Sequence, residues 1–306
     1  MELFNPKSNI DFMNLRKWSA IFSILICFSS IVTLVVKGLH WGLDFTGGIQ
    51  IVIQYPNQTL TVDEIRSRIT SAGFKEAQVL NYGTSKRFLI SIGPQTFSKQ
   101  AASVDKIMGV LIGAEKERVD IVGPQVGREL ATKGALAVLV SLIALLIYIA
   151  MRFEFRLGVS ALVGLIHDPI LILGIFSFFN VEFDLKALAG LLAVIGYSLN
   201  DTIVVFDRVR ENFIKLRRLT PLEIMNKSIN QTLSRTIMTS VLTLSVVLAL
   251  LIYGGETIQG FALALVIGIV IGTYSSIYVA GALAIWLGLS GKDFLAKMPK
   301  IIDDRP

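Results

Sequence analysis

Six long apolar stretches organise the chain, and each is long enough to cross a lipid bilayer, which takes about 20 residues of helix. They comprise residues 18–36, 134–151, 157–179, 185–206, 237–253 and 261–287. The first stretch follows basic residues, as a signal peptide would. It is long for a signal peptide, and no small-residue cleavage site follows it, so we expect it to remain as the first span. The pattern predicts an α-helical membrane protein with six transmembrane helices.

The longest polar segment, residues 38–128, separates the first two spans and has the pattern of a small α+β domain. Its "IQIVIQY" run alternates and is rich in β-branched residues, which is typical of a strand. Thr61 and Glu64 have the spacing of a capping box that begins a helix. Two further strand-like runs, a second helix and a last strand follow. The order βαββαβ predicts a ferredoxin-like domain, and it contains no nucleophile, phosphate-loop or His/Cys signature, so we expect a binding or lever domain.

Lysine and arginine in the short loops predict the orientation of the spans. Basic residues gather in residues 1–17, between spans two and three, in residues 207–235 and in the tail, residues 289–306. The two opposite loops are acidic or nearly neutral. Both termini are therefore expected in the cytoplasm and the 38–128 domain in the periplasm. Topology explains the net charge of +6, so no nucleic acid is expected as a partner.

Residues 207–235 are expected to form a cytoplasmic amphipathic segment. Thr220, Pro221 and Glu223 have the pattern of a helix start. We expect this helix to lie along the inner membrane surface before the chain turns into span five.

Composition agrees with a membrane protein, with 53% hydrophobic residues, 17% charged residues and a mean hydropathy of +0.65. The single cysteine, Cys27, excludes an intramolecular disulfide and a thiolate metal cluster. The two histidines, His40 and His167, are far apart in the sequence, and no zinc motif is present. We expect neither a metal nor a cofactor.

Asp201 interrupts the fourth apolar stretch about 24 Å along it, at 1.5 Å per residue. A carboxylate in hydrocarbon costs several kcal/mol, roughly 3, unless it is neutralised, paired or hydrated. One interpretation is that Asp201 caps or snorkels near the helix end. The other is a carboxyl group that faces the bundle and exchanges a proton, with Asn200 among the neighbouring groups that hydrate it.

Span five carries a polar stripe on one helical face, formed by Thr232, Arg235, Thr236, Thr239, Ser240 and Thr243. The stripe either lines a polar interior or satisfies its hydroxyls on its own backbone. Arg235 is either an interfacial topology charge or a partner of Asp201. In span three, His167 and Asp168 form either a structural pair beside Pro169, or a second relay station or a contact with a partner protein.

Three segments in this order, "LDFTGG", "VGREL" and "GYSLNDTIVVFDRVREN", closely resemble the SecD/SecF family of the bacterial Sec protein-export machinery, within the RND superfamily. The resemblance covers essentially the whole chain. It implies six spans and one outer domain, and it matches Asp44, Phe45, Gly47 and Gly48 to a family motif. It also matches Arg235 to an arginine thought to act with the span-four aspartate. The partners it implies are SecD, the SecYEG channel, exported preproteins and, indirectly, SecA, in a lipid membrane.

These observations predict a non-enzymatic inner-membrane subunit that assists protein export and uses proton flow to move its outer domain. Asp201 and Arg235 are the expected coupling residues. One rival is half of an RND-type exporter of small molecules or lipids, and another is a scaffold without ion coupling. Intramembrane proteolysis is the weakest alternative, because no zinc motif and no convincing second catalytic aspartate are present.

Overall fold

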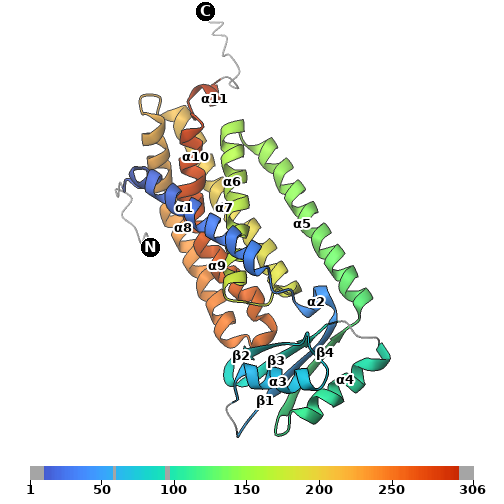
Figure 1. Cartoon of the computed structure of the whole chain (residues 1–306). Helices are drawn as coiled ribbons and strands as arrows, with labels where there is room; N and C mark the ends of the chain where they lie inside the picture. Colours follow the sequence, from blue (N-terminus) through green and yellow to red (C-terminus); the bar gives the residue numbers. More distant parts are fainter. Residues whose placement is uncertain (1–9, 58–59, 94–96, 296–306) are drawn as a thin grey trace, which may run out of the picture. The chain divides into compact units, whose positions relative to one another are not determined.

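The computed structural model describes residues 10–57, 60–93 and 97–295 (Figure 1). Lys7, Lys297, Lys300 and Arg305, which contribute to the predicted orientation, lie outside the described residues. The chain divides into two compact units. One unit comprises Met1–His40 with Val138–Pro306, and the other comprises Trp41–Ala137.

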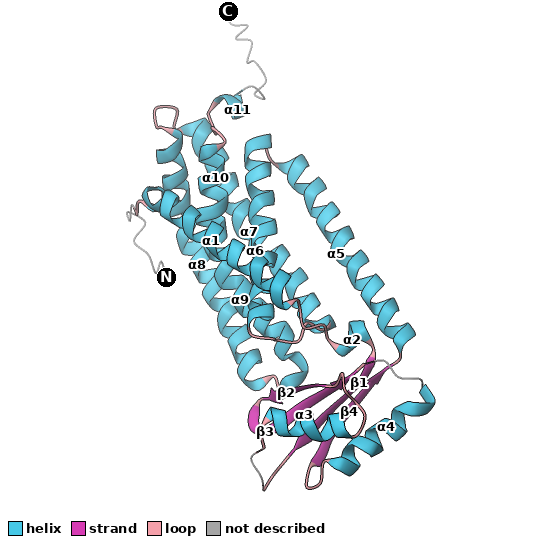
Figure 2. Cartoon of the chain, in the orientation of Figure 1, coloured by secondary structure: helices cyan, strands magenta, loops and turns pink. Residues whose placement is uncertain are grey.

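The Trp41–Ala137 unit is a small α+β domain. Its elements are α2 (Leu43–Thr46), β1 (Gly48–Gln54), α3 (Val62–Ser71), β2 (Gln78–Tyr82), β3 (Thr84–Ile92), α4 (Phe97–Val110) and β4 (Glu115–Val122). The sheet has the strand order β2-β3-β1-β4 with every neighbouring pair antiparallel. Figure 2 shows α3 and α4 on the same face of this sheet. The predicted βαββαβ order and the ferredoxin-like fold class are confirmed.

Alternating side chains of the strands create the core of this unit. Ile51 of β1 and Phe88 of β3 are completely buried, and they belong to one apolar cluster with Ile69 of α3 and Ile107 of α4. The predicted capping box fixes the start of α3, since Glu64 N–H donates to Thr61 Oγ1 and Thr61 N–H donates to the Glu64 carboxylate, at 3.3 and 2.8 Å.

The other unit is a bundle of helices. They are α1 (Arg16–Lys37), α5 (Pro124–Arg152, which begins in the α+β unit), α6 (Phe155–Phe178), α7 (Leu185–Lys215), α8 (Pro221–Tyr253), α9 (Gln259–Ser275) and α10 (Gly281–Trp286). Short elements accompany them: η1 (Phe12–Leu15), η2 (Glu256–Ile258), η3 (Ser276–Ala280) and α11 (Lys292–Leu295). Within the described residues, six helical segments are long and apolar enough to span a membrane. The chain is a multi-pass membrane protein, as predicted.

Helix α8 differs from the prediction. We expected a surface helix that turns into span five, but Pro221–Tyr253 is one continuous helix of 33 residues. The predicted start is correct, because Thr220 and Glu223 form a capping box. No glycine or proline follows between residues 222 and 253, so nothing in the sequence breaks the backbone hydrogen bonds.

The sixth span contains an irregularity that the sequence did not predict. A π-helical segment, η3, separates α9 from α10. Such segments are rare and occur often at functional sites. This one follows directly after Ser275, a residue of the polar network described below.

Glycines allow α7 and α9 to pack closely. A Cβ atom added at Gly190 would lie 2.8 Å from Phe261 O, and one added at Gly272 would lie 2.9 Å from Ser198 Cβ. Small residues at helix contacts are characteristic of membrane bundles. This close approach brings polar side chains of α6, α7 and α9 together in the interior.

Candidate functional site

Asp201 lies inside the bundle, and no hydrogen bond to its side chain is present within the described residues. Its side chain is 3% exposed, and its Oδ2 atom is buried without a hydrogen-bond partner in the described part of the chain. Helix α7 presents it where α7 packs against α8 and α9. Asn200, which we expected to hydrate it, is exposed, and the hydroxyl of the neighbouring Ser198 donates to Asp168. A buried polar atom without a partner needs an explanation in a native structure.

Arg235 lies on α8 and interacts electrostatically with Asp201. No ion pair joins them in the described structure, and the Arg235 residue is exposed. The two groups therefore attract each other across the α7–α8 contact without forming a closed salt bridge. The geometry leaves a carboxylate oxygen free while a positive charge is near it.

The polar stripe of α8 is satisfied partly by its own helix. Thr239 Oγ1 donates to Arg235 O at 3.0 Å and Thr243 Oγ1 donates to Thr239 O at 2.8 Å. Ser240 instead bonds across to Thr273 of α9 at 2.8 Å. Thr236 is 2% exposed, and its hydroxyl oxygen is buried without a partner among the described residues. Within the described part of the chain, α7 and α8 thus each carry a buried side-chain oxygen without a hydrogen-bond partner.

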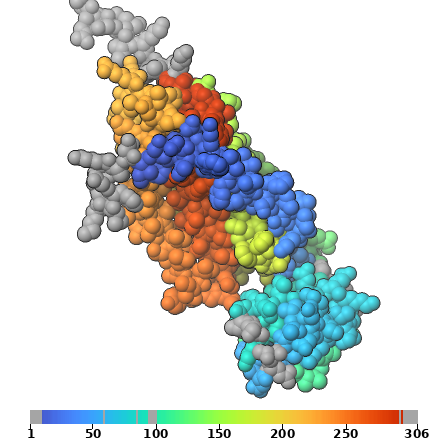
Figure 3. Space-filling view, turned by 60° about the vertical axis from the view of Figure 1, so that its left-hand side comes forward, coloured from blue at the N-terminus to red at the C-terminus, as the bar shows by residue number. Residues whose placement is uncertain are grey.

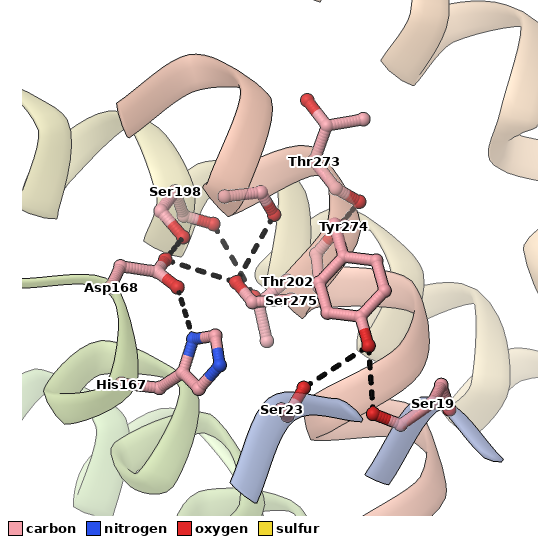
Figure 4. A network of polar contacts seen from close by, with 11 residues as sticks. Ser19, Ser23, His167, Asp168, Ser198, Thr202, Thr273, Tyr274 and Ser275 are labelled. Atoms are coloured by element: carbon pink, nitrogen blue, oxygen red, sulfur yellow. Dashed lines mark hydrogen bonds and ion pairs between the residues drawn. The ribbon is translucent and has the colours of Figure 1, made fainter. Parts of the chain in front are cut away.

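Asp168 is the centre of a polar network that joins three helices (Figure 4). Its Oδ1 atom lies 2.9 Å from His167 Nδ1. Its Oδ2 atom accepts hydrogen bonds from Ser198 of α7 and, at 3.0 Å, from Ser275 of α9. Asp168 is 1% exposed. A carboxylate with three donors is well compensated for its burial, so this network fixes the positions of α6, α7 and α9.

A second group of polar contacts fastens α1 to α9. The hydroxyl of Tyr274 donates to Ser19 O at 2.8 Å and lies 3.1 Å from Ser23 Oγ. Sequence reasoning missed Tyr274, Ser275 and Ser23. A serine or tyrosine inside an apolar run was the available signal, but such residues are too common in spans to single out a site.

The "LDFTGG" segment forms a tight entry into β1 in the α+β unit. Gly47 and Gly48 have φ values of +66° and +128°, which only glycine adopts readily. A Cβ atom at Gly127 would lie 2.8 Å from Gly47 N, so the start of α5 packs directly on this backbone. Asp44 lies in the first turn of α2, and the Phe45 ring packs edge-on against Trp41 with centroids 5.7 Å apart. The geometry indicates a structural role, because the segment packs the entry into β1 against the start of α5.

Comparison with known proteins decides the family. Residues 103–290 match the model "Protein export membrane protein SecD/SecF, C-terminal", and residues 32–55 match "SecD/SecF GG Motif". The chain belongs to the SecD/SecF family. The protein translocase subunit SecF of Vibrio alginolyticus is 47% identical over 94% of this chain and 93% of its own length. SecF of Pseudomonas aeruginosa is 41% identical, with 97% and 98% of the two chains covered.

Solved structures of the SecD/SecF family support the same assignment. The crystal structure of SecDF from Thermus thermophilus matches with a TM-score of 0.84 and 36% identity over 93% of this chain. SecDF in a super-membrane-facing form matches with a TM-score of 0.68 over 94% of this chain. The chain spans 39% of each SecDF chain. It is thus a multi-pass membrane protein with a role in protein export. Its family is named for translocase subunits and not for an enzymatic activity.

Proposed function

We propose that this chain is the SecF half of a SecD–SecF complex that couples proton flow across the membrane to movement of its α+β domain. The complex would thereby assist Sec-dependent export of preproteins. The observation that carries this proposal is Asp201, a carboxylate enclosed in the bundle with an oxygen that no described residue occupies. Ionisable residues inside spans commonly mark proton relays.

Arg235 supplies the second element of the proposed coupling. Its charge attracts the ionised form of Asp201 without closing an ion pair with it, so the carboxylate remains free to take up a proton. Each unit charge that crosses 100 mV releases about 2.3 kcal/mol. A few protons would suffice to drive a domain rearrangement.

The proposed partner is SecD, which would supply the other half of an RND-like bundle. This chain spans 39% of SecDF from Thermus thermophilus, and in the proposal SecD supplies the remaining part of that architecture. Polar faces that carry Arg235 are unfavourable in lipid and would be covered by SecD. Further proposed partners are the SecYEG channel, the exported preproteins and, indirectly, SecA.

The proposed orientation places both termini in the cytoplasm and the α+β domain in the periplasm of the inner membrane. In a variant without Cys27, a cysteine at the exposed residue Asn57 should react with an impermeant maleimide from outside the inner membrane. A cysteine at Lys215 should react only from inside. External labelling at Lys215 would contradict this orientation.

Preprotein export into inner-membrane vesicles, with and without a proton gradient, tests the function. Asp201→Asn keeps the size of the side chain but removes its titration, so the stimulation of export by the gradient should disappear while assembly with SecD survives. Asp207→Asn is the matched control, because it removes a carboxylate from the same helix at a half-exposed ion pair with Arg152. Such surface pairs contribute little, so gradient stimulation should persist.

Arg235 variants separate the coupling mechanism from its rivals. Arg235→Lys should retain part of the gradient stimulation, because a positive charge near Asp201 remains. Arg235→Met should lose most of it. Full stimulation by Asp201→Asn would favour an uncoupled scaffold. Export that is independent of this chain would leave the RND-type exporter as the alternative.

A further inference from the structure

Two asparagines of α8 bind the backbone of the chain just before α1. Ile10 N–H donates to Asn230 Oδ1 at 2.9 Å, and Asn230 Nδ2 donates to Ile10 O at 2.8 Å. Asn226 Oδ1 accepts from the N–H groups of Phe12 and Met13, at 2.8 and 3.4 Å. The two asparagines are four positions apart, so they lie on one face of α8. Four hydrogen bonds therefore join this segment to that face.

The side chains of the segment complete the attachment. Met13 is completely buried, and it belongs to the same apolar cluster as Met225 of α8. A Cβ atom added at Gly281 of α10 would lie 3.6 Å from Met13 Cε, so α10 packs against this side chain as well. The Phe12 ring lies edge-on to that of Tyr278 in η3, with centroids 6.2 Å apart. Figure 3 shows the start of the chain, in blue, lying across the orange and red helices, so the segment ties α8 to η3 and α10.

Helix α7 holds the same half of α8 from nearly the opposite side. Asn212 is 4% exposed, and its Nδ2 atom donates to Ser228 Oγ and to Gln231 Oε1, each at 2.8 Å. At about 100° per residue, these two partners lie roughly 150° around α8 from Asn226 and Asn230. The first half of α8 is thus fixed on two faces.

The second half of α8 makes few contacts within the described chain. In residues 241–253, Val247 alone is buried. Leu242, Val246 and Ile252 are 62%, 63% and 67% exposed. The position of α8 in the bundle is therefore set mainly by its first half.

Arg235 depends on this fixed half for its position. It follows Asn230 by five residues, which is about 7.5 Å along the axis at 1.5 Å per residue. No glycine or proline lies between residues 222 and 253, so the helix has no hinge between the two positions. A shift of the first half of α8 would therefore move Arg235 relative to Asp201 on α7.

We propose that residues 10–13 form a clamp on the first half of α8, and that Asn226 and Asn230 are positioning residues that hold Arg235 in place opposite Asp201. The clamp itself is independent of proton coupling. Its effect through Arg235 rests on the proposed function, so the two parts are tested by different measurements.

The reactivity of a cysteine at position 13 tests the clamp. In permeabilised inner-membrane vesicles with a Cys27→Ser chain, Met13→Cys should react with a water-soluble maleimide at least about tenfold more slowly than Asn14→Cys, because Met13 is buried and Asn14 is exposed. Adding Asn226→Ala and Asn230→Ala removes all four hydrogen bonds of the clamp. The reaction at position 13 should then accelerate about tenfold or more, because the open form is populated more often.

Lys227→Ala is the matched control for these two changes. Lys227 is exposed on the same helix beside Asn226, so its removal should leave the rate at position 13 unchanged. Two results would overturn the clamp. One is equal reactivity of Met13→Cys and Asn14→Cys in the chain that keeps both asparagines, and the other is unchanged protection of Met13→Cys in the chain without them.

Export into vesicles tests the effect through Arg235. At matched protein levels, Asn226→Ala with Asn230→Ala should lower the stimulation by the proton gradient about three- to tenfold and leave export without a gradient unchanged. The same two changes should have a smaller effect in an Arg235→Lys background, because the flexible lysine stem tolerates a shift of its helix better than the planar guanidinium does.

The comparison of the two backgrounds separates positioning from general support of the fold. An equal fold-loss in both backgrounds would overturn the positioning of Arg235, because independent effects multiply. Full gradient stimulation by Asp201→Asn would instead refute the proposed function, and the cysteine rates would still decide the clamp.

Discussion

Asp168 and Asp201 are two enclosed carboxylates on neighbouring helices, and their surroundings are opposite. Asp168 on α6 is contacted by His167, Ser198 and Ser275, which together occupy both of its oxygens. Asp201 on α7 has an oxygen without any described partner and a positive charge at a distance. Burial alone therefore does not distinguish a structural carboxylate from one that is available for chemistry.

The contrast indicates which carboxylate is better suited to exchange a proton in the proposed coupling. Protonating Asp168 would weaken three contacts at once and would loosen α6 from α7 and α9. Protonating Asp201 would break no described hydrogen bond. The surroundings of Asp201 therefore suit repeated uptake and release of a proton, whereas those of Asp168 suit holding the helices in place.

Removal of the Asp168 carboxylate should have the largest effect on stability. Asp168→Ala should lower the free energy of unfolding by about 2–5 kcal/mol, from three interhelical or local hydrogen bonds at roughly 0.6–1.7 kcal/mol each. An SDS titration of the purified protein in mixed micelles measures this. Asp168→Asn keeps one acceptor oxygen and should lose less. An unchanged unfolding midpoint for Asp168→Ala would contradict the network in Figure 4.

Asp201→Leu should leave the free energy of unfolding within about 1 kcal/mol of the parent protein or raise it. Replacing an unsatisfied buried polar group with an apolar one of similar size is close to neutral or stabilising. The same titration measures this, and export assays should show loss of gradient stimulation at normal protein levels. A loss of stability as large as that of Asp168→Ala would mean that Asp201 has partners of equal strength, and the contrast would fail.

The sequence revealed both carboxylates, because a charge in an apolar run breaks the pattern that defines the span. It did not reveal their difference. Ser198 and Ser275 are 30 and 107 residues from Asp168, and only the packing of α6, α7 and α9 brings them to it. Hydroxyls in spans usually bond to their own helix, as those of Thr239 and Thr243 do, so a serine by itself predicts no partner.

The fold was predictable where local signals determine it. The capping residues Thr61 and Thr220 mark helix starts, and alternation with β-branched residues marks the strands of the α+β unit. The π-helical segment Ser276–Ala280 was not predictable, because no proline or glycine lies within it. The continuity of α8 was not predicted. The change from polar to apolar residues suggested a turn there, but no glycine or proline between residues 222 and 253 interrupts the helix.

The smallest effects on stability are expected from removing single hydroxyl groups, one in the Asp168 network and one on α8 at its contact with α7. Ser275→Ala removes one of three donors to Asp168 and should lower the free energy of unfolding by about 0.6–1.7 kcal/mol. Thr236→Val removes a buried hydroxyl on α8 that has no described partner, so it should be neutral or slightly stabilising. The SDS titration resolves this pair because both changes delete one buried oxygen of a β-hydroxyl side chain. If Thr236→Val lowers the free energy of unfolding as much as Ser275→Ala does, the Thr236 hydroxyl has a hydrogen-bond partner when the protein is in the membrane. The α7–α8 contact around Asp201 would then be as fully paired as the surroundings of Asp168.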